Sequence, residues 1–91
     1  MYIKEFERYL QYERRYSKHT LIAYLHEISL FLVFLENEHL PFEEVGHRDM
    51  RHYFAKMAED ANKSATSVNR SISALRTYFK HLQREGLIQA N

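Results

Sequence analysis

Ninety-one residues suffice for one small domain, and such a chain buries only roughly 60% of its unfolded surface. An apolar share of 45%, with 27% charged residues, two glycines and one proline, excludes a disordered chain and predicts a compact globular domain. The absence of cysteine excludes disulfides, thiolate metal sites and a cysteine nucleophile.

The amino-terminal segment predicts neither a signal peptide nor a membrane anchor. Residues 1–7 already contain two glutamates, whereas a signal peptide has an uninterrupted apolar core. The longest wholly apolar run, residues 30–35, is too short to span a bilayer. We therefore expect a soluble, cytoplasmic protein without a membrane partner.

The net charge of +1 conceals an asymmetry along the chain. Residues 36–60 hold three basic and seven acidic side chains, a net charge of −4, whereas residues 61–91 hold five basic and one acidic, a net charge of +4. Residues 1–16 and 17–35 contribute +1 and zero. The distribution of charge along the chain says more about binding partners than the net charge does. It predicts a basic carboxy-terminal third that could bind a polyanion.

Two helices are predicted in the first 36 residues. Apolar residues at helical spacing favour a helix over about residues 3–14. Ser17 is a candidate N-cap for a second helix over about residues 18–36, because its hydroxyl can accept from the free N–H groups of the first turn. The expected core stripe of this second helix comprises Leu21, Leu25, Ile28, Leu32 and Leu35, with Tyr24 and Phe31 at its edge.

The second half of this helix is apolar all round, because Leu30, Val33 and Phe34 add to the stripe. Two explanations stay open, namely burial on every side and an interface with a partner. A small bundle favours burial.

Pro41 and Gly46 mark the main break before the third helix, which is expected over about residues 48–61. Ser64 is a second N-cap candidate and precedes a fourth helix over about residues 65–84. Gly86 follows at the position of a left-handed carboxy-terminal cap. Four helices without a strand pattern predict an all-α domain.

The fourth helix combines an apolar and a cationic face. At about 100° per residue, the apolar side comprises Val68, Ile72, Leu75, Phe79 and Leu82. The opposite side comprises Thr66, Asn69, Arg70, Ser73, Arg76, Thr77, Lys80 and Arg84. No Asp or Glu occurs in residues 61–84, although a helix exposed only to water normally mixes both signs.

This cationic face has the chemistry that double-stranded DNA requires of a partner. Lys and Arg neutralise phosphates and release counterions, while short polar side chains can approach sugars and base edges. A solvated charged face is the plainer alternative, and the missing acids favour nucleic acid.

A second basic cluster surrounds the start of the second helix. Arg14, Arg15, Lys18 and His19 lie near a helix N-terminus, where N–H groups and the helix dipole attract phosphate, and Thr20 adds a hydroxyl. Taken alone this signal is weak, since capped helix starts with nearby cations are common.

Several segments resemble the core-binding domain of Xer-type tyrosine recombinases and phage integrases. They are residues 12–24 (YERRYSKHTLIAY), 49–53 (DMRHY), 64–82 (SATSVNRSISALRTYFKHL) and 84–88 (REGLI), which together span most of the chain. The resemblance implies a compact, SAM-like orthogonal four-helix bundle that clamps one face of duplex DNA at the recombination site. A separate carboxy-terminal domain would close on the other face and carry out strand exchange without nucleotide or metal. Gly46 departs from the family, which often has a Ser or Thr cap there, and this leaves the start of the third helix open.

The resemblance also implies DNA contacts from two helices. Those of the second helix are Lys18, His19, Thr20 and Tyr24, and those of the fourth are Thr66, Ser67, Asn69, Arg70, Ser73 and Arg76. Lys80 joins them from the cationic face. Tyr24 has an alternative role in the core, because its ring lies at the edge of the apolar stripe.

We expect this chain to have no catalytic residue, no cofactor and no metal site. Residues 81–84 spell the His-x-x-Arg motif that the family uses in catalysis, but that motif belongs to the other domain, and here it forms the last turn of a helix. The seven tyrosines mostly have core spacing, and the six histidines lack metal-ligand spacing. Recombination, with other protomers in a synaptic complex, would belong to a longer parent enzyme, and the isolated domain is expected to be monomeric.

Two other hypotheses stay open. A helical protein-interaction module would dock a partner helix on Leu30, Val33 and Phe34 and would associate with rising concentration. A free-standing helix-turn-helix regulator would need a short recognition-helix turn, for which the sequence gives no sign.

Overall fold

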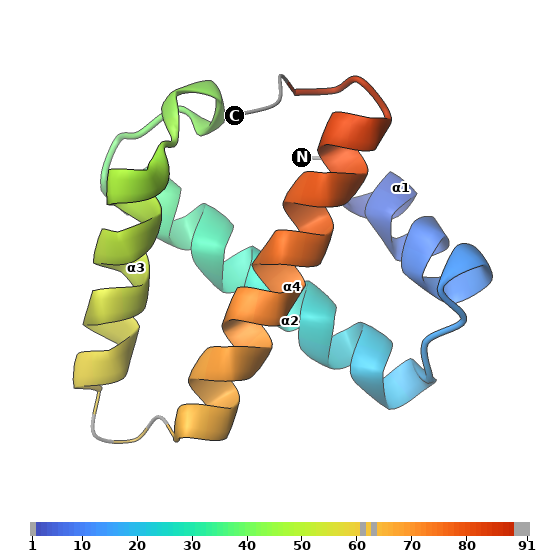
Figure 1. The fold of residues 1–91 in the computed structure, drawn as a ribbon, viewed down its shortest axis with the longest axis horizontal. Helices are drawn as coiled ribbons and strands as arrows, with labels where there is room; N and C mark the ends of the chain where they lie inside the picture. The colour runs from blue at the N-terminus through green and yellow to red at the C-terminus, as the bar shows by residue number, and fades with distance from the viewer. Residues whose placement is uncertain (1, 61, 63, 89–91) are drawn as a thin grey trace.

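The computed structural model describes residues 2–60, 62 and 64–88, which form helices and loops without a strand. The helical elements are α1 (Ile3–Arg8), the π-helical segment η1 (Tyr9–Glu13), α2 (Lys18–Asn37), the 3-10 turn η2 (Phe42–Glu44), α3 (His47–Glu59) and α4 (Ala65–Arg84). In Figure 1, α4 crosses α2 near the middle of the molecule, with α1 on one side and α3 on the other. The predicted all-α class is confirmed.

Serine hydroxyls cap the two long helices at their amino ends. Ser17 Oγ accepts a hydrogen bond from the backbone N–H of Thr20 at 3.2 Å, and Ser64 Oγ accepts one from the N–H of Ser67 at 3.1 Å. Each cap satisfies a backbone donor that the helix leaves free, which typically stabilises a helix by about 1 kcal/mol. These caps fix where α2 and α4 begin.

Left-handed residues end the same two helices. Gly86 follows α4 with φ of 72°, and the N–H of Leu87 donates to the carbonyl of Leu82 at 2.9 Å, as the sequence predicts for this glycine. After α2 the same role falls to His39, with φ of 53°. A β-carbon makes this conformation unfavourable, so the sequence gives no signal for it at His39.

Asp49 supplies the cap that a glycine side chain cannot give to α3. The N–H of Gly46 donates to Asp49 Oδ2 at 3.0 Å, and the N–H of Met50 donates to the carbonyl of Gly46 at 3.1 Å. α3 ends at Glu59, and residue 61, where the predicted third helix ends, lies outside the described residues.

The first predicted helix changes its pitch halfway. α1 is followed by a wider turn, in which the N–H of Arg14 donates to the carbonyl of Tyr9 at 3.0 Å and that of Tyr16 donates to Leu10 at 3.0 Å. Apolar spacing carries no signal for such a turn, so the sequence predicts one uniform α-helix here. The wide turn leaves Leu10 fully buried and returns Tyr16 to the start of α2.

The core fills the space between the crossing helices. Its fully buried large side chains are Phe6, Leu10, Ile28, Phe31, Leu75, Tyr78 and Leu82. Phe6 meets Tyr78 edge-on with ring centroids 4.9 Å apart, and Phe31 meets Tyr53 in the same way at 5.1 Å. Burying a side chain of this size stabilises the fold by about 1.5–3 kcal/mol. Because the buried residues come from α1, α2, α3 and α4, all four helices depend on one core.

The buried face of α4 differs in part from the predicted one. Leu75 and Leu82 are buried as predicted, but the other three predicted side chains, Val68, Ile72 and Phe79, are only half-buried. The buried face extends instead to Ser71, Ala74, Tyr78 and His81. The reason is that α1 and η1 cover the adjoining side of α4, where their aromatic rings contact Tyr78 and His81.

The expected burial of α2 on every side is wrong at Val33, which is 52% exposed. Leu30 and Phe34 are half-buried and line a shallow hollow of about 280 Å³ beside α3. By length and composition alone α2 could cross a membrane, a property that core helices of globular domains share. Here its buried side packs against α4 and α1.

His81 lies in the core without a hydrogen-bonding partner. It is 4% exposed, its ring stacks on Tyr9 with centroids 4.6 Å apart, and Phe6 lies at 5.6 Å. Neither ring nitrogen has a hydrogen-bond partner in the structure. Burial lowers the pKa of His81 below 6.5, with a smaller lowering effect from Arg84, while Glu85, Glu13 and Glu5 act to raise it.

We expect the free energy of unfolding to fall as the pH falls below about 6.5, because the unfolded chain then binds a proton at His81 before the folded chain does. Above this pH both states are neutral at His81 and the full stability is present. Urea denaturation of the wild type and of His81→Phe, at neutral and mildly acidic pH, measures the effect.

His81→Phe should show a shallower loss of stability in acid than the wild type. His26→Phe replaces an exposed histidine and serves as the matched control, with wild-type pH dependence expected. An equally steep loss in wild type and His81→Phe would contradict the prediction.

Candidate nucleic-acid interface

One side of α4 is exposed and cationic. We use the name basic face for its exposed residues Thr66, Asn69, Arg70, Ser73, Arg76 and Lys80. No described carboxylate lies within ion-pair distance of the three cations among them. Their charge is therefore available to a partner in solution.

Arg84 continues the same side in the sequence but has a different role in the structure. Its Nη2 lies 3.4 Å from Glu13 Oε2 and 3.9 Å from Glu85 Oε1, and its guanidinium carbon lies 4.6 Å from the centre of the Tyr9 ring. The guanidinium thus joins the end of α4 to η1. The free cationic surface ends at Lys80.

The start of α2 presents a second group of the predicted residues. Lys18 and His19 are exposed in its first turn, and Thr20 is half-buried. The hydroxyl of Thr20 accepts a hydrogen bond from Ser17 Oγ at 3.0 Å. An exposed lysine beside the positive end of a 20-residue helix makes a surface that attracts anions.

A row of side-chain contacts leads from the segment before α2 through Tyr24 to the basic face. Arg14 Nη2 donates to the hydroxyl of Tyr16 at 3.0 Å, and the ring of Tyr16 meets Tyr24 edge-on at 5.2 Å. The hydroxyl of Tyr24 shares a hydrogen bond of 2.7 Å with Ser73 Oγ on the basic face. The start of α2 and the middle of α4 therefore belong to one connected surface.

The ring and the hydroxyl of Tyr24 have different surroundings, and its contact with DNA stays a prediction. Its half-buried ring packs against the core, while its hydroxyl reaches the surface at Ser73. Burial raises the pKa of the neighbouring Tyr16, and Tyr24 adds to this rise.

Ser67 differs from the other predicted residues of α4. It is half-buried, its N–H is bound by Ser64, and its hydroxyl accepts from Ser64 Oγ at 3.2 Å. Ser67 thus takes part mainly in the hydrogen bonds that cap the start of α4. Thr66 beside it is exposed.

The His-x-x-Arg string and two of the tyrosines take part in the packing of the bundle. No set of three His, Asp or Glu side chains in the described part of the chain is placed to bind a metal ion. His81 is buried, and Arg84 is engaged by Glu13, so the His-x-x-Arg string has a packing role. Tyr53 and Tyr78 are buried, and burial raises the pKa of Tyr78 to about 12.

The burial of two further polar residues could not be predicted from the sequence. Glu27 is 6% exposed and Ser71 is fully buried, and neither Glu27 Oε1 nor Ser71 Oγ has a hydrogen-bond partner in the structure. Both lie near the phenol of Tyr53, whose pKa is raised by burial, lowered in part by the Ser71 hydroxyl and raised again by Glu27. Because a glutamate on an amphipathic helix is normally exposed, no pattern in the sequence predicts this burial.

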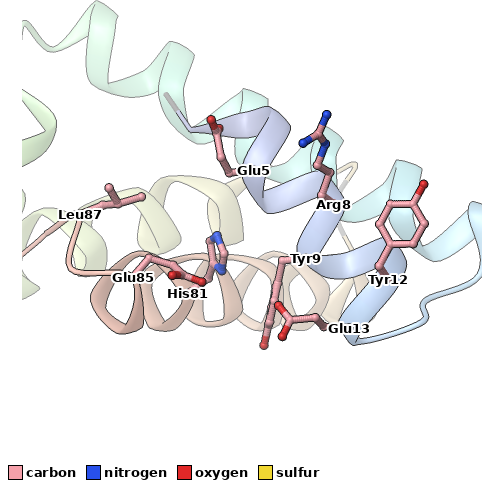
Figure 2. Close-up of a pocket in the computed structure, with 8 residues that line it drawn as sticks. All are labelled: Glu5, Arg8, Tyr9, Tyr12, Glu13, His81, Glu85 and Leu87. Atoms are coloured by element: carbon pink, nitrogen blue, oxygen red, sulfur yellow. The ribbon is translucent and has the colours of Figure 1, made fainter.

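A cavity between α1, η1 and the end of α4 also lies outside the predicted site. Its volume is about 540 Å³. Figure 2 shows the lining residues: Glu5, Arg8, Tyr9, Tyr12, Glu13, His81, Glu85 and Leu87. They come from the two ends of the chain, so their proximity depends on the packing of α1 against α4.

The chain matches the family model described as phage integrase, N-terminal SAM-like domain, over residues 3–86. It is 38% identical over 88 residues to the tyrosine recombinase XerC of Leptospira interrogans, which is 97% of this chain and 28% of the relative. It is 37% identical over 91 residues to XerC of Bacillus subtilis, 99% of this chain and 30% of the relative. A tyrosine recombinase of Pseudothermotoga lettingae is 32% identical over 90 residues, 98% of this chain and 32% of the relative.

The chain thus spans about a third or less of the length of these relatives. No solved structure gives a significant match.

We expect the hydrogen bond between Tyr24 and Ser73 to stabilise the junction of α2 and α4. Tyr24→Phe should lower the free energy of unfolding by about 0.5–1.5 kcal/mol, the usual net contribution of such a bond. Ser73→Ala should do the same, and the double variant should lose less than the sum of the two, because both single variants remove the same bond.

Urea denaturation of the four proteins at neutral pH gives this coupling energy. Tyr12→Phe removes a hydroxyl from an exposed tyrosine and is the matched control, for which no change is expected. Strict additivity of the Tyr24 and Ser73 effects would show that the bond does not form in solution.

Proposed function

The chain belongs to the phage integrase N-terminal SAM-like domain family, and we propose that it is a duplex-DNA clamp of a tyrosine-type site-specific recombinase. The observation that supports this best is the acid-free basic face, whose three cations lie exposed on a helix held firmly by the core behind it. An exposed cationic surface of this kind favours phosphate contacts through counterion release.

The proposed contacts divide into two chemical types. Arg70, Arg76 and Lys80 would neutralise phosphates, while the short polar residues Thr66, Asn69 and Ser73 would approach sugars and base edges. Ser67 would contribute at the amino end of α4, beside its role in the cap.

The start of α2 would hold a second stretch of the DNA backbone. Lys18 and His19 are exposed there, and Thr20 and Tyr24 would extend the contact toward Ser73. Because the Tyr24–Ser73 bond ties the two regions together, the surface would meet DNA as a preformed unit.

We further propose that strand exchange lies with a separate carboxy-terminal domain of the parent enzyme. The relatives that share this segment are tyrosine recombinases, and the chain covers only 28–32% of their length. The domain would act in the cytoplasm, monomeric on its own and with other protomers in the synaptic complex of the full enzyme.

The hypothesis of a protein-interaction module on α2 has less support. Leu30 and Phe34 are half-buried, which leaves Val33 as the exposed member of that surface. The similarity to recombinases also gives no reason to prefer it.

Removing cations from the basic face should weaken DNA binding and its salt dependence. We expect Arg70→Ala with Lys80→Ala to lower the affinity for a labelled mixed-sequence duplex. The slope of log K against log salt should also become shallower by about 2, because each of the two lost phosphate contacts contributes about −0.9 to it. Fluorescence anisotropy between roughly 50 and 200 mM salt measures both quantities.

Arg51→Ala on α3 removes one exposed cation of the same kind elsewhere and is the matched control, with a nearly unchanged slope expected. Thermal unfolding of each variant checks that the bundle is intact. A double variant that binds with wild-type affinity and slope would show that the basic face is the wrong surface.

A further inference from the structure

The cavity between α1, η1 and the end of α4 has the features of a binding site outside the basic face. It measures about 540 Å³, enough for a small organic group, and none of its lining residues belongs to the basic face. Aromatic side chains form part of its wall, and Leu87 adds an apolar contact.

His81 is the polar group at the inner side of this cavity. The imidazole is only 4% exposed, and both of its nitrogens lack a partner in the structure. In Figure 2 the ring rises from α4 toward α1, between Glu85 and Tyr9, while the Glu5 carboxylate on α1 points away from it in this view. An unsatisfied buried polar group is unfavourable, so a ligand that donates to the free imidazole nitrogen would gain from pairing with it.

The charges around the cavity favour a cation. Three lining residues are glutamates, Glu5, Glu13 and Glu85, against one lining arginine, Arg8. Arg84 on the margin lies 3.4 Å from Glu13 and 3.9 Å from Glu85, so these five side chains leave a net charge of −1. Carboxylates form strong charge-assisted hydrogen bonds with guanidinium and ammonium groups, and the faces of tyrosine rings attract the same groups.

The chain already holds one guanidinium in this way. Arg84 lies over the ring of Tyr9 at 4.6 Å and pairs with Glu13 at 3.4 Å on the margin of the cavity. The same combination of ring and carboxylate therefore accepts a guanidinium here. No set of three described His, Asp or Glu residues is placed for a metal ion, which points to an organic cation.

We propose that this cavity binds the guanidinium or ammonium group of an organic cation, which donates to the imidazole of His81 and pairs with Glu5 and Glu85. The group could belong to a free small molecule or to a basic side chain of a polypeptide. Its charge and its N–H donors are common to both sources.

The test uses pairs of probes that differ in charge and little in shape. Butylguanidinium and the neutral butylurea represent a free ligand, and short peptides with a central arginine or its neutral urea analogue citrulline represent a polypeptide. NMR spectra of the labelled 91-residue chain, recorded above pH 7 at fixed ionic strength, follow the ring signals of His81 and Tyr9.

We expect the cationic member of at least one pair to shift these signals in a saturable way, and its neutral partner to leave them unchanged. Glu85→Gln and Glu5→Gln should each weaken binding by about tenfold, the loss of one charge-assisted hydrogen bond. Glu43→Gln in η2 removes an exposed carboxylate elsewhere and should bind like the wild type.

The two arms separate the sources. Saturable shifts with butylguanidinium indicate a free cation, and shifts with the arginine peptide alone indicate a polypeptide side chain. Equal binding of charged and neutral probes, wild-type binding by both glutamine variants, or no shift with any probe at millimolar concentration would each overturn the proposal.

Discussion

The crossing of α2 and α4 is the constraint on which the rest of the structure depends. α4 must bury one side against α2, α1 and α3, and because a helix has only one opposite side, its polar residues are left facing solvent. The core places Tyr78 and Leu82 on the inside and Arg70 and Lys80 on the outside of the same helix. Stability and the proposed DNA contact thus arise from one amphipathic element.

The features that local sequence determines could be predicted. Ser17 and Ser64 form their caps, and Gly86 adopts the left-handed conformation, because each acts through the backbone of its own turn. The exposed polar side of α4 could also be predicted, because polar and cationic residues recur at helical spacing opposite the apolar ones and no Asp or Glu occurs in residues 61–84. The same sequence resemblance anticipated the family.

The features that depend on distant contacts could not be predicted. The burial of His81 and the orientation of Arg84 require η1 to pack beside α4, which joins residues about 70 positions apart. The π-helical turn after α1 and the left-handed His39 are local, but they arise from residues that do not favour these conformations. The cavity that we propose for a cation forms only where residues 5–13 pack beside residues 81–87, so no single segment of the sequence predicts it.

The most direct measurement is an NMR titration of the labelled chain with duplex DNA, which maps the bound surface residue by residue. If the basic face and the start of α2 form the DNA contact, the amides of residues 66–80 and 18–24 should shift first and together, with the core signals retained. Shifts confined to α3, η2 or α1, with the basic face unchanged, would contradict the assignment of α4 as the helix that meets DNA.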